Sequence, residues 1–311
     1  MKRPWCCVLV LLLVALVGCG REARIASKSF TESVVLCEIA REAGSTDDAP
    51  VEHLWEVGGT QVLWQGLLRG DLDAYPDYTG TIAEDIFPQT KFPTQEAQRY
   101  ELLKEKLAEK GVLMTAPLGF NNTYAIGMTK QRAAELGVKS LSDLAGHPDL
   151  KFGFSPEFMN RSDGWPGLKA AYAWPYTDAS ARGIQHSLAY KALAEGEIDA
   201  MDLYATDPKI KQLDLVALVD DREFFPQYNA VFLYRDDLPA RAPLLVAAMN
   251  DLAGRLDDET MMGLNEQVEL HKRRESAVAA EFVGAAQATS PRRSAMRRIA
   301  RATAAHLYLV L

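Results

Sequence analysis

Residues Gly58–Thr81 read GGTQVLWQGLLRGDLDAYPDYTGT and set an order of helix, strand and loop that recurs later in the chain. Thr60–Arg69 is predicted to form a short amphipathic helix, because apolar residues recur in it at helical spacing. Its apolar face is expected to consist of Val62, Leu63, Leu67 and Leu68. Gly70 suits the left-handed backbone position that commonly ends a helix.

A strand is predicted to follow this helix at Leu72–Tyr75. We expect Pro76 to end that strand, because proline cannot donate a hydrogen bond to a sheet ladder. Residues 77–81, Asp-Tyr-Thr-Gly-Thr, should then form a loop at the end of a strand. Loops in this position carry ligand contacts in α/β proteins, so this loop is a candidate binding segment.

A second stretch, Leu188–Asp207, repeats the pattern as LAYKALAEGEIDAMDLYATD. The matching pairs are Gly70 and Gly196, Asp73 and Asp199, Ala74 and Ala200, and Tyr78 and Tyr204. Each copy also follows a strand, a basic residue and a helix in the same order. These are Arg24–Ser27, Lys28 and Thr31–Ala43 in the first half, and Lys151–Phe154, Arg161 and Gly164–Tyr172 in the second. The repeat predicts two similar α/β lobes, with Tyr78 and Tyr204 facing each other across a cleft.

We expect the first lobe to comprise residues 21–118 and 229–287, and the second lobe to comprise residues 119–228. The chain is predicted to cross between the lobes twice, at Gly119–Met128 and Ala230–Tyr234. Two crossings make a hinge, which is the architecture of a protein that clamps a ligand. With 311 residues and 48% apolar content, the chain is long enough to bury the cores of two such lobes.

Residues 1–19 have the features of a bacterial lipoprotein signal peptide. Lys2 and Arg3 form a basic n-region, and Cys6–Val17 is an apolar region too short for an ordinary membrane span. It ends in Leu-Val-Gly-Cys, which resembles a lipobox, so Cys19 is expected to carry a lipid and to become the mature N-terminus. A plain secretory signal and an uncleaved anchor are the alternatives.

The part of the chain between this signal and the C-terminal tail is strongly acidic. Residues 21–289 contain 27 bases and 42 acids, a net charge of −15. This charge argues against nucleic acid or an anionic membrane surface as a partner of the folded part. The basic tail 288–311 differs, with five arginines and a closing apolar run. It is either a frayed C-terminus or the start of a fused or truncated permease segment, and its apolar run is too short to span a bilayer.

Catalytic and metal-binding signatures are missing from the sequence. The five histidines show no metal-ligand spacing such as HExxH, and neither a G-x-S-x-G elbow nor a Walker A loop occurs. Asp73 and Asp199 are expected to fix local turns. Cys37 has apolar neighbours and is predicted to be a buried, inert thiol, so no disulfide framework is expected either. No enzyme activity, cofactor or metal is predicted. The alternative of a secreted enzyme acting on choline esters or amines would need a nucleophile with a base, and no such pair can be named in the sequence.

The tyrosines and two basic residues carry the functional prediction. Tyr78, Tyr124, Tyr204 and Tyr228 are expected on loops or strand ends rather than at core spacing. A box of aromatic faces attracts a cation that cannot hydrogen-bond, above all a quaternary ammonium group. Lys28 and Arg161 each follow the first strand of a lobe and suit a carboxylate at the other end of the ligand. The combination predicts a zwitterionic ligand.

Several short motifs agree with one known family. They are Ser27–Glu32 (SKSFTE), Gly58–Thr60 (GGT), Tyr75–Thr81 (YPDYTGT), Asn121–Tyr124 (NNTY), Arg161–Gly164 (RSDG), Asp202–Asp207 (DLYATD) and Phe224–Tyr228 (FFPQY). With these motifs the chain resembles the osmoprotectant-binding family, the glycine betaine/choline-binding proteins of ABC importers, over roughly residues 24–287. Ser29, where asparagine is common, and the bulky Trp165-Pro166-Gly167 depart from the family pattern and bear on the choice of ligand.

The resemblance implies a two-lobe α/β periplasmic binding protein fold, type II-like, with an ABC permease in the membrane as its partner. It places the cage tyrosines at Tyr78, Tyr124, Tyr204 and Tyr228, and the carboxylate contacts at Lys28, Thr81 and Arg161. The expected function is extracytoplasmic capture of a quaternary ammonium osmolyte for import, by a protein anchored through the lipid on Cys19. Glycine betaine is the expected ligand. A choline- or carnitine-specific binding protein and a ligand-sensing domain of a membrane receptor are the alternatives.

Overall fold

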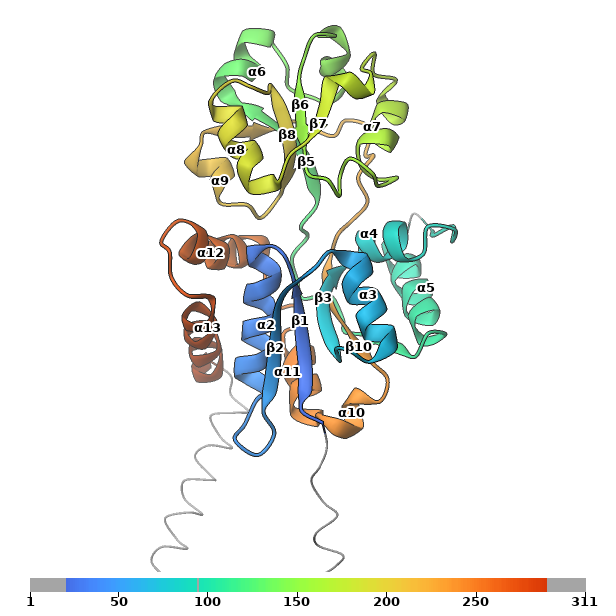
Figure 1. The fold of residues 1–311 in the computed structure, drawn as a ribbon, viewed down its shortest axis with the longest axis vertical. Helices are drawn as coiled ribbons and strands as arrows, with labels where there is room; N and C mark the ends of the chain where they lie inside the picture. Colours follow the sequence, from blue (N-terminus) through green and yellow to red (C-terminus); the bar gives the residue numbers. More distant parts are fainter. Residues whose placement is uncertain (1–20, 94, 290–311) are drawn as a thin grey trace, which may run out of the picture.

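The chain forms two α/β lobes, one above the other, joined by two crossings (Figure 1). The computed structural model describes residues 21–93 and 95–289. The predicted signal peptide with Cys19, and the tail from residue 290 onward, lie outside the described residues. No helix within the described ranges is long and apolar enough to cross a membrane. The predicted α/β fold of two lobes with two hinge crossings is confirmed.

The first lobe is built on a mixed five-stranded sheet with the order β2-β1-β3-β10-β4. Its strands are β1 (Ala23–Lys28), β2 (Val51–Gly58), β3 (Ala74–Tyr78), β4 (Val112–Met114) and β10 (Ala230–Arg235). Its helices are α2 (Thr31–Gly44), α3 (Thr60–Arg69), α4 (Thr79–Thr81), α5 (Glu96–Ala108), α10 (Leu238–Arg241), α11 (Pro243–Asp251), α12 (Asp258–Glu269) and α13 (Glu275–Thr289), with a π-helical turn at Ile82–Ile86.

The second lobe has a sheet of the same size with the order β7-β6-β8-β5-β9. Its strands are β5 (Tyr124–Thr129), β6 (Phe152–Phe154), β7 (Ala181–Gly183), β8 (Ala200–Tyr204) and β9 (Leu215–Ala217). Its helices are α6 (Lys130–Leu136), α7 (Trp165–Tyr172), α8 (His186–Ala194) and α9 (Lys209–Gln212), with 3₁₀ turns at Ser142–Gly146 and Asp178–Ser180.

The two sheets have equivalent pairing, as the sequence repeat predicts. In the first lobe β1 pairs in parallel with β2 and β3, and β10 pairs antiparallel with β3 and β4. In the second lobe β6 pairs in parallel with β7 and β8, and β5 pairs antiparallel with β8 and β9. The strands that begin after the two crossings, β5 and β10, therefore occupy equivalent positions beside β8 and β3.

The paired aspartates of the repeat hold two equivalent strands, β1 and β6. The Asp73 carboxylate accepts the backbone N–H of Arg24 at 2.8 Å, and the Asp199 carboxylate accepts that of Lys151 at 2.9 Å. Each is also bonded by an arginine, Arg241 for Asp73 and Arg132 for Asp199. Both carboxylates thus fix the start of a strand, a longer-range role than the local turn expected from the sequence.

Helix α3 has the predicted bounds and the predicted left-handed glycine after it, Gly70 with φ of 75°. Its buried face differs from the prediction, because Leu63, Trp64 and Leu67 are buried while Val62 is 52% exposed. The buried residues pack on the sheet with the side chains of β3 and α5. The face turned to the sheet is therefore rotated by about one residue from the expected one.

The prediction that Pro76 ends a strand is wrong. Pro76 lies inside β3, opposite Phe232 of β10. The ladder bonds to β10 lie at alternate positions, since Arg235 N donates to Asp73 O and Thr79 N donates to Asn229 O. Position 76 needs no donor to β10, and β1 pairs with β3 earlier, at Ala74. The strand therefore continues through Asp77 and Tyr78, and residues 79–81 begin a helix instead of a loop.

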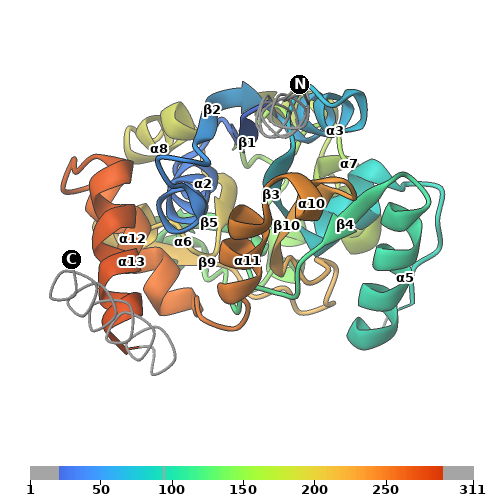
Figure 2. The ribbon, with the colours of Figure 1, turned by 90° about the horizontal axis from the view of Figure 1, so that it is seen from below.

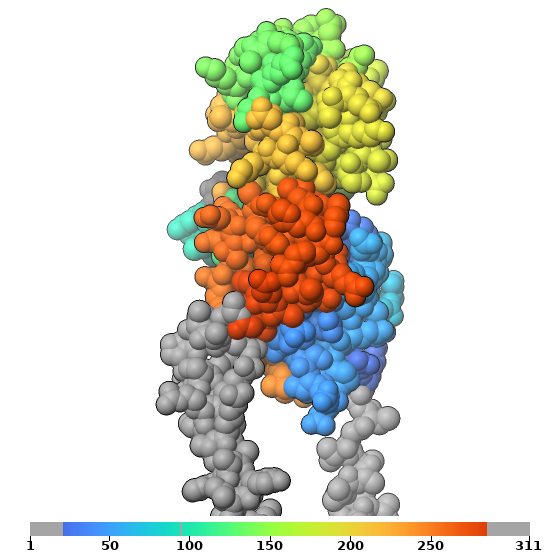
Figure 3. All heavy atoms as spheres, turned by 90° about the vertical axis from the view of Figure 1, so that its left-hand side faces the viewer, coloured from blue at the N-terminus to red at the C-terminus, as the bar shows by residue number. Residues whose placement is uncertain are grey.

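The C-terminal helices cover one side of the first lobe. Helix α2 packs against α11, α12 and α13, while α3 and α5 lie on the other side of the sheet (Figure 2). The two crossings run together through an antiparallel bridge between Asn121 and Asn229. On the face in Figure 3, the gold surface of the second lobe near α9 meets the orange-red surface of α12. The described residues of both lobes thus contact each other on the α12 side.

Candidate functional site: aromatic rings and buried charges between the lobes

Three of the predicted cage tyrosines form one cluster. Tyr124 is the first residue of β5 and Tyr204 the last of β8, and the two are opposite each other in the antiparallel ladder. Their ring centroids are 5.4 Å apart. Tyr228, just before β10, contacts the Tyr124 ring edge-on at the same centroid distance of 5.4 Å. Strand pairing and the second crossing therefore bring together residues far apart in sequence.

The fourth tyrosine, Tyr78, is joined to this cluster through Phe30, which the functional prediction did not include. Phe30 is the N-cap residue of α2, and its ring stacks on Tyr78 at 6.4 Å and on Tyr204 at 6.0 Å between centroids. The Phe30 ring thus links the tyrosines that the repeat relates. One sequence signal could have identified Phe30. It is an aromatic residue at an N-cap, where Ser, Thr, Asp and Asn are preferred.

Close packing after β3 positions Tyr228 and Thr81. A Cβ atom on Gly80 would lie 2.7 Å from two carbons of the Tyr228 ring and 3.0 Å from the carbonyl oxygen of Gln227. Only glycine leaves room for Tyr228 to lie against this turn. Thr81 is buried at the end of α4, three residues after Tyr78. The sequence YPDYTGT therefore sets both ring packing and the position of Thr81.

Lys28 is buried and already has polar partners. Its ammonium nitrogen Nζ lies 2.7 Å from Oδ1 of Asp77 and 2.8 Å from Oγ1 of Thr60. The same Nζ lies 5.7 Å from the centroid of the Tyr78 ring. The pair is neutral as a whole, so Lys28 presents at most a local donor to a ligand rather than a free positive charge.

Arg161 is similarly buried and paired, but one of its nitrogens is unsatisfied. Nε and Nη2 donate to the two carboxylate oxygens of Asp163, whose Oδ2 also accepts the Tyr228 hydroxyl at 2.5 Å. Burial lowers the pKa of Arg161, but the bonds and charge of Asp163 outweigh burial and raise it, so the side chain stays charged. Nη1 has no hydrogen-bond partner within the described chain. The nearest carboxylate oxygens, on Glu157 and Asp85, are 3.6 and 3.8 Å away.

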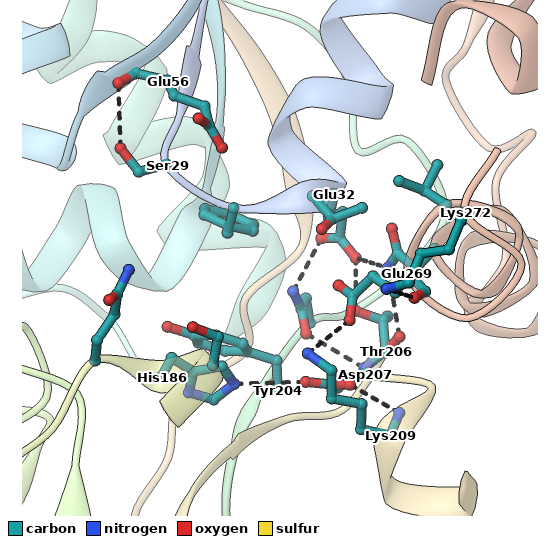
Figure 4. A pocket seen from close by; sticks show the side chains of 17 residues that line it. Ser29, Glu32, Glu56, His186, Tyr204, Thr206, Asp207, Lys209, Glu269 and Lys272 are labelled. Atoms are coloured by element: carbon teal, nitrogen blue, oxygen red, sulfur yellow. Dashed lines mark hydrogen bonds and ion pairs between the residues drawn. The ribbon is translucent and has the colours of Figure 1, made fainter. Parts of the chain in front are cut away.

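A pocket of about 420 Å³ opens between the lobes beside these rings (Figure 4). Its inner wall includes Phe30 and Tyr204, and the remaining predicted site residues do not line it. Glu32 projects into it from α2, Glu269 and Lys272 lie on the side of α12, and Asp207 and Lys209 lie near α9 (Figure 4). The Lys209 ammonium is 2.9 Å from the Glu269 carboxylate, which joins the two lobes across the pocket.

Glu32 is a second group that the functional prediction did not include. Its carboxylate accepts four hydrogen bonds, from the Tyr78 hydroxyl, the Thr206 hydroxyl and the amides of Asn122 and Asn265. Burial raises its pKa, and the four hydrogen bonds lower it without cancelling the increase. Glu32 follows Thr31 at the start of a helix, where an acidic residue is an ordinary favourable charge, so local sequence contains no sign of this network.

His186, the first residue of α8, contacts the Tyr204 ring in a tilted arrangement with ring centroids 4.5 Å apart. Nδ1 lies 3.7 Å from the Asp202 carboxylate and Nε2 lies 3.4 Å from the Asp207 carboxylate. Burial lowers the pKa of His186, but these two carboxylates outweigh burial and raise it to about 9. At neutral pH the imidazole is therefore charged, and it packs against the Tyr204 ring.

The described residues of the chain contain one free cysteine, and it is buried. Among residues 21–93 and 95–289, no cluster of three or more His, Cys, Asp and Glu could hold a metal ion. The buried Cys37 has a pKa well above its usual value, because burial disfavours the thiolate. The prediction that this thiol is buried is thus confirmed.

Comparisons with known proteins identify one family of substrate-binding proteins. A family model described as the substrate binding domain of ABC-type glycine betaine transport systems matches residues 22–285. A glycine-betaine-binding protein of Pseudomonas aeruginosa is 30% identical over 292 residues, which cover 90% of this chain and 93% of that protein. The ergothioneine transport permease/ergothioneine binding protein of Helicobacter pylori is 33% identical over 262 residues, 83% of this chain and 46% of that protein. The chain therefore spans about half the length of this second relative.

Solved structures agree in fold. The crystal structure of a glycine betaine/carnitine/choline ABC transporter superposes with a TM-score of 0.68 at 27% identity, covering 85% of this chain and 98% of that one. A lactococcal protein in a closed, glycine betaine-bound conformation superposes with a TM-score of 0.61 at 12% identity, covering 86% and 96%. The predicted binding-protein fold and the resemblance stated from the motifs are both confirmed.

Proposed function

This chain belongs to the OpuAC family, the substrate binding domains of ABC-type glycine betaine transport systems, and we propose that it captures a quaternary ammonium zwitterion. Members of the family are solute-binding proteins and not enzymes, which confirms that prediction. Glycine betaine is the proposed ligand, delivered to an ABC permease. The proposed location is outside the cytoplasm, with the chain held at the membrane by a lipid on Cys19.

The observation that carries this proposal is the convergence of aromatic rings from both lobes. Tyr78 and Phe30 come from the first lobe, Tyr124 and Tyr204 from the second, and Tyr228 from the crossing between them. A desolvated cation gains about 1–2 kcal/mol from each ring face it contacts. A trimethylammonium group cannot hydrogen-bond, so ring faces are the protein groups suited to it.

The carboxylate end of the ligand is proposed to bind near Arg161, Lys28 and Thr81. Arg161 offers the buried Nη1, which has no hydrogen-bond partner within the described chain. An unsatisfied buried donor is costly, so a ligand carboxylate would supply the missing acceptor. Two alternative ligands are choline, which lacks a carboxylate, and carnitine, which has a carboxylate.

A titration series tests the proposed function. Calorimetry with glycine betaine, choline, carnitine and ergothioneine, the last being the ligand named for the Helicobacter pylori relative, should give micromolar binding of at least one zwitterion. Tyr204→Ala should weaken that binding by about 1–2 kcal/mol, and Tyr204→Phe by less, because the ring face remains. If none of the ligands binds, the proposal is wrong. If Tyr204→Ala binds as the wild type does, Tyr204 is a packing residue.

A further inference from the structure

One buried carboxylate at this site accepts hydrogen bonds but has no basic partner among the described residues. Glu32 is 3% exposed. Oε1 accepts from Tyr78 and Asn122, and Oε2 accepts from Thr206 and Asn265, at 2.5 to 3.0 Å. Two donors on each oxygen satisfy the acceptor positions of an ionised carboxylate. The Asn122 amide is oriented by a second bond, because its oxygen accepts Thr206 N at 3.4 Å.

Four other carboxylates around the site differ from Glu32, because they have a basic partner. Asp77 is paired with Lys28, Asp163 with Arg161, Asp207 with His186, and Glu269 with Lys209. Within residues 21–93 and 95–289, no basic side chain lies within 4.0 Å of the Glu32 carboxylate. Lys272 lines the same pocket, but its ammonium donates to the backbone oxygen of Glu269 at 2.6 Å.

An ionised carboxylate that is buried without a counter-charge is energetically costly. Glu32 lines the pocket between the lobes together with Phe30 and Tyr204, two of the converging rings (Figure 4). The Glu32 oxygen Oε1 accepts a hydrogen bond from the hydroxyl of a third ring, Tyr78. A cation held against these rings would therefore lie close to the uncompensated charge.

We propose that Glu32 is the fixed negative charge that pairs with the ammonium group of the bound ligand and selects cationic over neutral headgroups. This inference rests on the proposed function and adds a residue to it. Ring faces favour a cation but also pack well against an uncharged group of the same shape. A full negative charge nearby discriminates more strongly between a cationic and a neutral headgroup, because Coulomb attraction in a partly buried site is only weakly screened.

The test compares two ligands that differ only in the charge of one group. Glycine betaine has a trimethylammonium group, and 3,3-dimethylbutanoate has a tert-butyl group of the same shape and the same carboxylate. The measured quantity is the ratio of their dissociation constants in the wild type, in Glu32→Gln and in Glu42→Gln. Glu42 is exposed on the same helix α2, so its variant removes the same charge away from the pocket.

In Glu32→Gln the preference for glycine betaine should fall by about tenfold or more, the scale of a lost charge pair at an effective dielectric of ~20. In Glu42→Gln it should change by less than about threefold. A purely structural role for Glu32 would weaken both ligands equally and leave the ratio unchanged, which would overturn the inference. A wild type that binds both ligands alike would overturn it too.

A second variant covers the case in which Glu32→Gln does not fold. Val268 lines the pocket and is partly exposed, so Val268→Lys introduces a cation there while Glu32 stays in place. The preference for glycine betaine should fall in Val268→Lys and persist in Val268→Met. Equal ratios in the two Val268 variants would contradict the inference. Failure of the wild type to bind any quaternary ammonium ligand would instead contradict the proposed function.

Discussion

At the residue scale, Arg161 combines a structural and a proposed binding role. Two of its nitrogens hold Asp163, which in turn holds the Tyr228 hydroxyl. The third, Nη1, is buried and unsatisfied among the described residues. A substitution there removes a donor for the ligand and also leaves Asp163, only 4% exposed, without its counter-charge.

Arg161→Ala should therefore affect stability and affinity together. Breaking a buried ion pair by removing one partner costs about 3–5 kcal/mol of stability. Glycine betaine affinity should fall about tenfold to a hundredfold, since a charged hydrogen bond contributes roughly 1.5–3 kcal/mol. Choline, which lacks a carboxylate, should lose less.

Thermal unfolding and calorimetry on Arg161→Ala and on the double variant Arg161→Ala/Asp163→Asn separate these roles. The double variant should recover part of the stability, because the unpaired carboxylate is gone, but not the glycine betaine affinity. An equal loss of glycine betaine and choline affinity would show that Arg161 only supports the cleft.

At the scale of elements, helix α8 begins with a charged histidine that is held by two carboxylates. A positive charge at a helix N-terminus is normally unfavourable. Asp202 on β8 and Asp207 after it compensate this charge and raise the pKa of His186 to about 9. The contact attaches the start of α8 to the end of β8, where Tyr204 is located.

This raised pKa predicts how stability changes with pH. The folded pKa lies above the ordinary value of about 6.5, so the stabilisation is fully present below pH ~6.5 and is lost as pH rises through about 9. Relative to His186→Gln, the wild type should be more stable by about 2 kcal/mol at pH 6. That advantage should disappear near pH 10.

Urea unfolding of both proteins at the two pH values measures this difference. We expect less than the full effect of the pKa shift, because neither imidazole nitrogen is within hydrogen-bonding geometry of its carboxylate. A stability difference that is the same at pH 6 and pH 10 would show that His186 contributes by packing on Tyr204 alone.

At the scale of the whole molecule, polar contacts join the lobes around the aromatic rings. Glu32 accepts the Thr206 hydroxyl, Lys209 is paired with Glu269, and the Thr60 hydroxyl lies 3.3 Å from the Glu157 carboxylate. The two crossings that meet at Asn121 and Asn229 are the natural hinge. Ligand binding is expected to favour the state in which these contacts form.

Lys209→Met should therefore weaken ligand binding only modestly, by about threefold or less, since a partly exposed ion pair contributes about 0–1 kcal/mol. Small-angle scattering should show a decrease in radius of gyration when glycine betaine is added to the wild type. The variant should need more ligand for the same decrease. An unchanged radius at saturating ligand would contradict closure of the lobes on binding.

Much of the fold could be predicted because its determinants are local. Helix α3 and its terminal Gly70 follow from residue spacing and backbone preference, and the repeat of Gly, Asp-Ala and Tyr predicted two lobes with equivalent sheets. Pro76 was misjudged, because whether a strand tolerates proline depends on the register of the neighbouring strand β10. That register is not visible in the local sequence.

The sequence by itself determined which chemical groups are present: tyrosine rings, two bases and the small residues that let them pack. Only the tertiary structure decided which charges are paired and which are not. Lys28 reaches Asp77 across 49 positions, and Glu32 reaches Thr206 and Asn265 across 174 and 233 positions. Burial and charge compensation depend on groups brought together from distant segments, so neither Phe30 between the tyrosines nor the uncompensated charge of Glu32 could be read from local pattern.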